Sequence, residues 1–504
     1  MILSKQTIQQ IESKSVQVPL ETYFDLPEKV VQFGTGVLLR GLTDYFIDKA
    51  NKQGIFNGRI VVVKSTDTGD TGAFDRQDNL YTTCVRGLEA GKKVEENIIN
   101  ASISRVLSAK KDWKEILACA VNPEIELVIS NTTEVGIVLV NEDISVSPPA
   151  SFPGKLLAFL YERFKFFKGD SNKGMVIIPT ELLPDNGEKL LSILIELAKL
   201  NKLEKGFSDW LKKDNCFCSS LVDRIVPGKL SAQQQNETET ILGYGDELMI
   251  MSEVYRLWAI EPDNEKVKRV LSFSKADEGV VIAPDIYLYR ELKLRLLNGS
   301  HTLSCGLAHL AGFTLVNEAM KDPAFSSYVK TLMMEEITPA ITDKYLTNEV
   351  AIDFANKVLD RYRNPYLEHK WLSITLQYSS KMRMRDLPIL LSYYKRFSKV
   401  PGYIALGFAA HILFMKSVKN DDGNYYGEIN GKKYLIQDNN AGYYAEKWKQ
   451  PQTIVETILS DTDLWGNDLS GLPGFTETVM NKLNLLLEKG AGTVVKNMTM
   501  EMAG

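Results

Sequence analysis

Residues 29 to 50 read KVVQFGTGVLLRGLTDYFIDKA, and this stretch decides the fold. A β-branched apolar run, KVVQF, leads into a Gly-Thr-Gly turn, and an amphipathic pattern typical of a helix follows. Glycines in such a turn let the backbone approach a pyrophosphate, which the first N–H groups of the helix can bind. Leu39 replaces the third glycine of G-x-G-x-x-G, so the interpretation depends on the strand-turn-helix context. The stretch therefore predicts a dinucleotide-binding turn.

Similar apolar runs alternate with helical patterns through the first half of the chain. We expect further strands at residues 59–65, 126–130, 174–179 and 219–226. Their continuous apolar character is typical of parallel strands that are buried on both faces of a sheet. This half of the chain is therefore predicted to be of the α/β class.

After Pro284 the pattern changes to long amphipathic helices. The exception is residues 424–438, where Asn430 and Gly431 separate two alternating runs and favour a hairpin with a type I′ turn. A chain of 504 residues also exceeds what one hydrophobic core usually holds. We therefore predict an α/β protein with a Rossmann-type, mostly parallel sheet domain over residues 1–283 and a mainly α-helical domain over residues 284–504.

The composition is that of an ordinary globular protein and excludes several partners. A net charge of −5 and a pI near 5.7 do not suit a nucleic-acid binder. The N-terminus has no apolar secretory region, and no run approaches the roughly 18 apolar residues of a membrane span. Five cysteines in so long a chain do not form a disulfide framework. We expect a cytoplasmic monomer or small homo-oligomer that binds a small molecule, with no nucleic-acid or membrane partner.

The dinucleotide interpretation selects candidate cofactor-binding residues around the turn. They are the strand end, the turn and the first helical residues: Val31, Gln32, Phe33, Gly34, Thr35, Gly36, Val37, Leu38, Leu39 and Arg40. Asn131 and Thr132 follow another predicted strand at its carboxyl end, where open α/β sheets bind ligands, although ordinary turn chemistry also explains them. The place of the usual ribose-binding acid holds Lys64, Ser65 and Thr66, with Asp67 and Asp70 just beyond, so NAD and NADP both stay open.

The stretch KLRLLNGSH, residues 293 to 301, places three polar residues in an apolar helical pattern. In a regular helix Lys293 and His301 project about 80° apart and Asn298 about 60° beyond His301. Asn298 and Gly299 could instead break the helix, with Ser300 capping the next one. A lysine of lowered pKa could take a hydroxyl proton during hydride transfer, Asn298 could stabilise the alkoxide and His301 could orient the substrate, without a metal.

Less specific explanations of the same residues stay open. Lys293 could extend its amine to solvent, and His301 could be a satisfied core histidine. A zinc site made by His301, Cys305 and His309 is a further hypothesis, but the third residue lies too far along the helix to share one ion with the first.

The spacing of Lys293, Asn298 and His301 resembles the signature of the polyol-specific long-chain dehydrogenases, the mannitol dehydrogenase family. The agreement extends along most of the chain and includes QFGTGVLLRG, DNLYTT at 78–83, SNTTEVGI at 130–137, LLPDNG at 182–187, LVDRIVP at 221–227, YRLWAIE at 255–261 and RYRNPYLEH at 361–369. The resemblance implies a metal-independent NAD(P) dehydrogenase whose active site lies between a Rossmann-type domain and a helical domain.

The same resemblance implies individual roles. Lys293 would be the general acid/base, Asn298 an oxyanion donor and His301 a substrate-binding residue, and Asp223 in the matching VDR motif would line the cleft. Members that act on mannitol carry a second oxyanion asparagine where this chain has Leu182. The substrate would then be held differently, or Asn186 would take part.

Within the family, the sequences of several segments resemble those of members that act on a sugar acid with NAD. A sugar acid needs cations for its carboxylate, and arginine matches a carboxylate bidentately. The candidates lie in SSKMRMRDLP and RYRNP: Lys381, Arg383, Arg385, Arg361, Arg363 and Asn364. We expect one or two of them to bind substrate and the rest to form solvated helix faces. The nearest alternative is a family member whose substrate is another polyol or sugar acid. An alternative of a different class is a non-catalytic protein that senses NADH or a sugar acid.

Overall fold

The computed structural model describes residues 1–66, 71–132 and 136–501. The chain divides into two compact units. The first comprises Met1–Arg86 and Lys93–Ile286, and the second comprises Gly87–Lys92 and Tyr287–Gly504. The sequence placed this division between residues 283 and 284.

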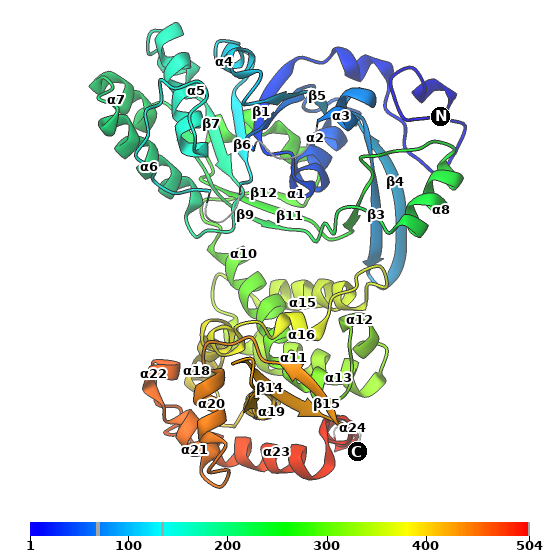
Figure 1. Ribbon diagram of the computed structural model, residues 1–504, viewed down its shortest axis with the longest axis vertical. Helices are drawn as coiled ribbons and strands as arrows, with labels where there is room; N and C mark the ends of the chain where they lie inside the picture. Colours follow the sequence, from blue (N-terminus) through cyan, green and yellow to red (C-terminus); the bar gives the residue numbers. More distant parts are fainter. Residues whose placement is uncertain (67–70, 133–135, 502–504) are drawn as a thin grey trace. The chain divides into compact units, whose positions relative to one another are not determined.

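A six-stranded sheet forms the centre of the first unit (Figure 1), and its neighbouring strands all pair in parallel. Its order is β5-β2-β1-β6-β7-β8, with bounds Ile103–Ser108, Arg59–Lys64, Glu28–Phe33, Leu127–Ser130, Val176–Pro179 and Cys216–Phe217. The chain starts at the centre and builds outward in both directions, which is the doubly wound order of dinucleotide-binding domains. The predicted fold class is confirmed.

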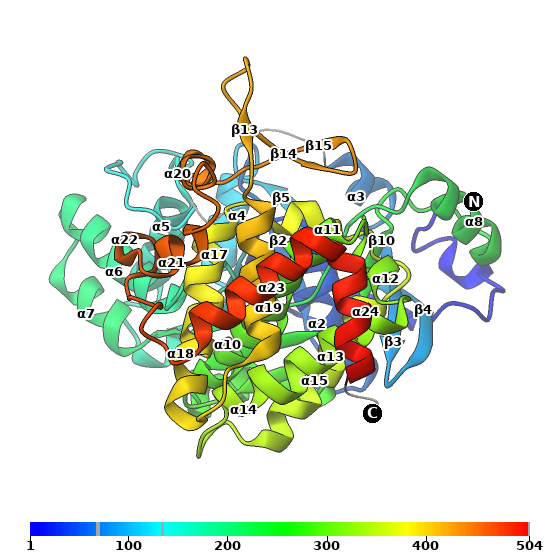
Figure 2. The ribbon, with the colours of Figure 1, turned by 90° about the horizontal axis from the view of Figure 1, so that it is seen from below.

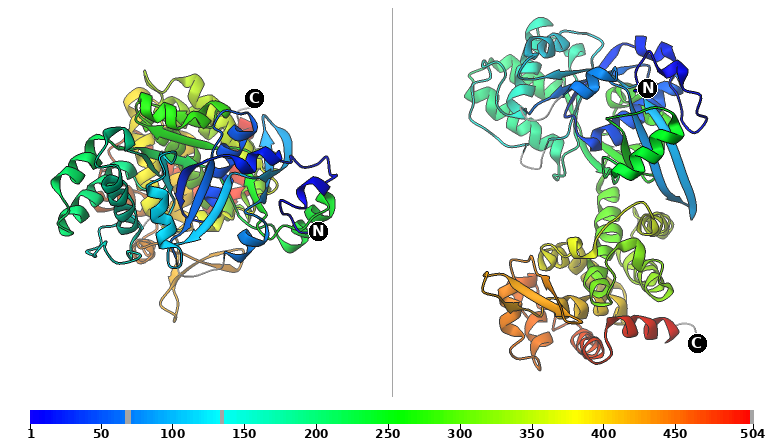
Figure 3. Two further views of the ribbon diagram at one scale, coloured as in Figure 1. Left: turned by 90° about the horizontal axis from the view of Figure 1, so that it is seen from above. Right: turned by 45° about the vertical axis from the view of Figure 1, so that its right-hand side comes forward.

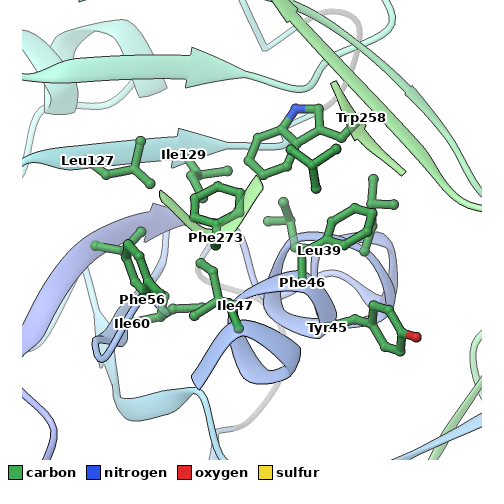
Figure 4. Packing of buried hydrophobic residues seen from close by; sticks show 14 of the residues in the cluster. Leu39, Tyr45, Phe46, Ile47, Phe56, Ile60, Leu127, Ile129, Trp258 and Phe273 are labelled. Atoms are coloured by element: carbon green, nitrogen blue, oxygen red, sulfur yellow. The ribbon is translucent and has the colours of Figure 1, made fainter. Parts of the chain in front are cut away.

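Apolar residues cover both faces of this sheet, because alternate side chains of each strand point to opposite faces. Val30 of β1 lies in one core cluster and Val31 in another, and both are wholly buried. Figure 4 shows the first cluster, in which the ring of Phe273 lies between those of Trp258 and Phe56. The α-helices of this unit are α1 Val37–Gly41, α2 Thr43–Lys52, α3 Gly72–Arg76, α4 Trp113–Ala120, α5 Phe152–Phe166, α6 Asn186–Leu200, α7 Lys205–Lys213, α8 Ala232–Leu242 and α9 Glu265–Val270.

Two smaller sheets differ from the prediction. The run 219–226 was expected in the parallel sheet, but β9, Ser219–Asp223, pairs antiparallel with β11, Leu257–Glu261. That assignment was wrong because β8 takes the edge of the large sheet; β12, Val280–Ile282, completes the smaller one. A further sheet, visible from two sides in Figure 3, was not predicted and consists of β10 Ile250–Glu253, β3 Tyr81–Glu89 and β4 Lys92–Asn100.

The second unit is mainly helical, as predicted. Its α-helices are α10 Tyr287–Glu291, α11 Ser300–Leu310, α12 Val316–Ala319, α13 Pro323–Thr331, α14 Thr338–Ile341, α15 Asn348–Arg363, α16 Trp371–Ile374, α17 Tyr378–Lys381, α18 Leu387–Arg396, α19 Gly402–Phe414, α20 Ala441–Lys447, α21 Ile454–Leu459, α22 Thr462–Trp465, α23 Phe475–Lys489 and α24 Ala491–Glu501. Segments Leu292–Gly299, Leu332–Ile337 and Met382–Asp386 are π-helical. Within the described ranges, no helix has the length and apolar character needed to traverse a bilayer.

The predicted hairpin is confirmed (Figure 2). Strands β14, Tyr425–Ile429, and β15, Lys432–Leu435, pair antiparallel, and the short strand β13, Val418–Lys419, pairs with β14. Asn430 and Gly431 between them have φ angles of 49° and 74°. Two positive φ angles in succession are what a type I′ turn requires.

Candidate active site

The Gly-Thr-Gly turn lies at the carboxyl end of the central strand β1. Gly34 has a φ of 133°, and a Cβ atom there would lie 2.8 Å from the carbonyl oxygen of Asn131. No larger residue fits this position, because backbone would have to move. Gly36 is exposed, and a Cβ atom on it would meet no other atom within 4 Å. The turn thus presents bare backbone where doubly wound sheets bind nucleotides.

Only part of the predicted cofactor-binding stretch reaches the surface. The side chains of Val31, Phe33 and Leu39 are buried in the apolar core. Arg40 is buried as well, and its Nη1 donates to the carbonyl oxygen of Leu248 at 2.7 Å. These four side chains have structural tasks and Gln32 is also wholly buried, which leaves Gly34, Thr35, Gly36, Val37 and Leu38 as the accessible part of the motif. Leu39 fills core space at the position of the missing third glycine.

Asn131 and Thr132 extend the polar surface beside the turn. The backbone N–H and the hydroxyl of Thr132 both donate to Glu181 Oε1, at 2.8 and 3.0 Å. Asn131 Nδ2 donates to Thr180 Oγ1 at 2.9 Å, so the carboxyl ends of β6 and β7 are tied together. Sequence reasoning missed Glu181, although a carboxylate directly after a predicted strand was a usable signal.

The region expected to bind the ribose is only partly described. The Lys64 amine donates to the backbone carbonyl of Thr66. Asp67 and Asp70 lie outside the described residues, as do residues 133–135 of the SNTTEVGI motif.

In the second unit, residues 287–310 form one continuous helical stretch, as one of the two alternatives expected, and the other alternative, a local break at Asn298 and Gly299, is wrong. Gly299 has helical dihedral angles, φ −64° and ψ −51°, and Ser300 caps no new helix. Between residues 292 and 299 the helix is π-helical, with hydrogen bonds from i to i+5. Lys293 and Asn298 are five residues apart and therefore lie about one turn apart on the same side of the helix. In a regular α-helix their side chains would point roughly 140° apart.

Hydroxyl groups satisfy the carbonyls of this π-helical segment. The Tyr362 hydroxyl donates to the Leu297 carbonyl at 2.9 Å, and Thr302 Oγ1 donates to the Asn298 carbonyl at 2.8 Å. Ser300 Oγ contacts both the Leu296 carbonyl and the Tyr362 hydroxyl. Since buried carbonyls need donors, these side chains stabilise the wider turn.

His301 lies buried in an aromatic and cationic pocket. Its ring stacks on Tyr362 with centroids 4.0 Å apart, and the ring of His369 meets it edge-on at 5.3 Å. The pKa of His301 is lowered well below its ordinary value, mainly because the ring is buried. A smaller contribution comes from the charges of the nearby His369, Arg361, Arg385 and Lys381. The imidazole is therefore neutral at physiological pH. Its Nε2 has no hydrogen-bond partner in the described structure, so a bound hydroxyl would complete its bonding.

The predicted carboxylate-binding residues separate into two groups. Arg361, Lys381 and Arg385 all lie close enough to His301 to lower its pKa. Arg385 Nη1 donates to Thr302 Oγ1 at 3.0 Å, and burial lowers the pKa of Arg385. Arg383, in contrast, is exposed and donates to the Asp463 carbonyl at 3.1 Å.

The other two members of the RYRNP segment also have structural contacts. Arg363 donates to Ser326 Oγ at 3.2 Å, and the backbone carbonyl of Asn364 accepts from Asn317 Nδ2 at 3.3 Å. The structure thus brings together Arg361, Lys381 and Arg385 around His301, and gives Arg363, Asn364 and Arg383 other neighbours.

Asn186 does not replace the second oxyanion amide. Its Nδ2 donates to the backbone carbonyls of Pro179, Glu181 and Ser220 at 3.0–3.1 Å, and its Oδ1 accepts from the Ser220 N–H at 2.9 Å. Both ends of the amide are used to join β7 to β9, which corrects the suggestion that Asn186 binds substrate. Leu182 nearby is 57% exposed, and Asp223 is buried at the end of β9.

The zinc hypothesis fits the structure poorly. His309 packs against the rings of Phe414 and Tyr434, whereas His301 packs against Tyr362. Across residues 1–66, 71–132 and 136–501, no group of three His, Cys, Asp or Glu side chains is arranged to hold a metal ion.

Known proteins resemble this chain over nearly its whole length. Residues 28–272 match the mannitol dehydrogenase Rossmann domain, and residues 285–487 match the mannitol dehydrogenase C-terminal domain. The altronate oxidoreductase of Bacillus subtilis strain 168 is 37% identical over 476 residues, which cover 93% of this chain and 94% of the relative. That of Yersinia enterocolitica is 36% identical over 480 residues, covering 93% and 96%.

Solved structures agree on the fold. The mannitol 2-dehydrogenase of Pseudomonas fluorescens, in ternary complex with NAD and D-mannitol, has a TM-score of 0.68 at 23% identity and covers 99% of this chain and 100% of that one. A substrate-free D-sorbitol dehydrogenase has a TM-score of 0.77 at 19% identity, covering 98% and 100%. The chain belongs to the mannitol dehydrogenase family and is a dehydrogenase of polyols or sugar acids that acts on a CH–OH group.

Proposed function

We propose that the protein interconverts D-altronate and D-tagaturonate with NAD, by metal-independent hydride transfer, in hexuronate breakdown. Two relatives named altronate oxidoreductase share more than a third of its residues. Tagaturonate reductase is another name for altronate oxidoreductase. Four segments of this chain resemble that enzyme in sequence: QFGTGVLLRG, VVVKSTDTGD, SSKMRMRDLP and the hairpin. The structural observation that supports a sugar acid most directly is the group of cations around His301.

The turn after β1 suits the pyrophosphate of a dinucleotide. Gly34 approaches the Asn131 carbonyl too closely for any side chain, and Gly36 leaves the N-terminus of α1 uncovered. Backbone N–H groups of residues 35–38 would hold the phosphates. When bound, NAD accepts a hydride from the carbinol carbon, and NADH returns it.

Three side chains of the second unit would handle the proton and the substrate oxygen. Lys293 takes the hydroxyl proton as the hydride leaves the same carbon, so a carbonyl forms and charge balances. Asn298, one π turn along, donates a hydrogen bond to the oxygen while it carries negative charge. The neutral His301 uses its unpartnered Nε2 to orient a substrate hydroxyl.

Arg361, Lys381 and Arg385 would bind the carboxylate. Burial lowers the pKa of Lys381, and the neighbouring Arg385 lowers it further. Partly buried like charges repel one another, and an anion placed among them relieves that repulsion. A neutral polyol offers no such compensation, so the cluster favours a sugar acid over mannitol.

A steady-state assay with NADH and NADPH tests the assignment. Tagaturonate, fructuronate and fructose serve as competing substrates, and we expect the highest kcat/KM with NADH and tagaturonate. Fructuronate reductase and mannitol 2-dehydrogenase are the alternative activities within the family. A strong preference for fructose would contradict a sugar-acid function.

The Arg385→Gln variant tests the carboxylate site, with Arg383→Gln as the matched control. A lost charge-assisted contact of about 1.5–3 kcal/mol should raise KM for tagaturonate roughly 10- to 100-fold. KM for fructose should change little, because fructose has no carboxylate. Arg383→Gln should leave both constants nearly unaltered, since Arg383 contacts the Asp463 carbonyl. Equal increases for both substrates in Arg385→Gln would make Arg385 a structural residue.

A further inference from the structure

A buried polar pair lies beneath the nucleotide turn. Gln32 is a wholly buried amide within the apolar strand β1, and Asp44 is a wholly buried carboxyl on α2. Neither belongs to the turn itself. Buried polar groups are costly unless they are hydrogen-bonded, so their partners are informative.

The contacts form a chain from the carboxyl group to the turn. Gln32 Nε2 lies 3.4 Å from Asp44 Oδ2 and 3.4 Å from the Gly34 carbonyl oxygen, and it can donate to both. The hydroxyl of Thr43 lies 3.0 Å from Asp44 Oδ1 and 3.2 Å from Gln32 Oε1. Both amide hydrogens of Gln32 therefore have acceptors, and one acceptor belongs to the turn.

The Gly34 carbonyl controls the direction of the next N–H group. A trans peptide is planar, and its C=O and N–H bonds point in opposite directions. A Gly34 carbonyl bonded inward to Gln32 therefore turns the Thr35 N–H outward. In a glycine turn before a helix, outward N–H groups are the donors that phosphates use.

We propose that Gln32 and Asp44 are positioning residues that aim the Thr35 N–H at the pyrophosphate of the dinucleotide, with Asp44 acting through Gln32. This inference rests on the proposed NAD-dependent function. An ionised Asp44 can only accept hydrogen bonds, so the NH₂ group of Gln32 must face it. A protonated Asp44 can donate, which allows the amide to flip and release the Gly34 carbonyl.

The charged surroundings of Asp44 define its pH range. Arg40 of α1 and Tyr81 of β3 face the carboxyl, and Asp48 and Asp246 lie beyond them. Burial raises the pKa of Asp44 to about 6, opposed by hydrogen bonds from Thr43 and Gln32 and by Arg40. Dinucleotide affinity should therefore fall as pH drops through this value.

Titrations with NADH at about pH 8, monitored by NADH fluorescence, test the roles of Gln32 and Asp44. Loss of one hydrogen bond in Gln32→Met should raise the NADH Kd about three- to tenfold. The double variant Gln32→Met/Asp44→Asn should bind no more weakly than Gln32→Met alone, because Asp44 acts through Gln32. Asp48→Asn is the matched control. Asp48 is similarly buried one turn along α2 but accepts from the Ala101 N–H at 2.9 Å, so this variant should keep the native Kd.

An unchanged Kd in folded Gln32→Met, or fully additive effects in the double variant, would overturn the inference. If Gln32→Met does not fold, a pH series on the unaltered protein and Asp44→Asn decides. A Kd that rises at least threefold from about pH 7 to about pH 5 in the unaltered protein only would support the pair, and equal slopes would refute it. Absence of any NADH binding by the unaltered protein would instead refute the proposed function, and this inference with it.

Discussion

Replacing Gly299 by alanine puts a methyl group where the Asp386 carboxyl already lies. The new Cβ would be 2.8 Å from Asp386 Oδ1 and 3.2 Å from Ile389 Cδ1. Asp386 and Ile389 are 0% and 1% exposed, so neither can move into solvent. Overpacking of this kind costs about 1–3 kcal/mol, and the better helix propensity of alanine returns about 0.5–1. We expect a net destabilisation of about 1–2 kcal/mol.

Thermal unfolding measures this loss against a matched control. Gly492 also lies in a helix, α24, but a Cβ there meets no atom within 4 Å. At about 2–4 °C per kcal/mol for a unit of this size, Gly299→Ala should lower Tm by about 2–8 °C. Gly492→Ala should leave Tm unchanged or raise it slightly. If both variants behaved alike, the contact with Asp386 would not be what excludes a side chain at residue 299.

The same variant should lose activity beyond its loss of stability. Gly299 ends the π-helical segment that aligns Lys293 with Asn298, and a displacement of about 1 Å in such a site costs roughly 100-fold in rate. We expect kcat to fall at least tenfold at a temperature where the variant is folded. Native kcat in folded Gly299→Ala would show that the π alignment is not needed for turnover.

Two other substitutions test separate parts of the second unit. Lys293→Ala should lower kcat by about 10²- to 10⁴-fold while the NADH Kd stays within about twofold, and surviving turnover would assign proton transfer to another group. Glu336 accepts the N–H groups of Tyr403 and Ile404 at the start of α19, and burial raises its pKa from 4.5 to about 7. The folded state then holds a proton that the unfolded state has released, so the free energy of unfolding should fall by roughly 3 kcal/mol as pH rises from about 4.5 to 7. Denaturant titrations of Glu336→Gln should lack this slope, and an unchanged slope would point to a different group.

The strands that the sequence predicted best are those buried on both faces. β1, β2, β6 and β7 are short apolar runs, and burial on two faces produces that pattern. The ribbon of β3 and β4 was missed because polar and charged residues interrupt its apolar runs. The turn between the two strands was also hard to recognise from the sequence. Ala90 and Gly91 have the positive φ angles of a type I′ turn, but alanine stands where asparagine is usual.

The candidate site was predictable in residue type and spacing, but not in geometry. Lys293, Asn298 and His301 could be selected as chemical groups, whereas the π-helical turn is stabilised by the hydroxyl of Tyr362, which is remote in sequence. Periodicity at 100° per residue cannot show such a turn, because tertiary contacts produce it. Gln32 was selected only as part of the cofactor-binding stretch, although an amide inside an apolar strand needs a specific partner.

In the π-helical segment, residues five apart lie on one side of the helix, as residues four apart do in a regular α-helix. A π turn resembles an α turn with about one residue inserted, and the flanking helix keeps its direction. Deletion of one residue between Lys293 and Asn298 would convert the wide turn to an ordinary one, with the two groups at i and i+4 on one face. A lysine and an asparagine separated by three residues in a regular α-helix would thus present the same pair of groups as the four-residue spacing found here.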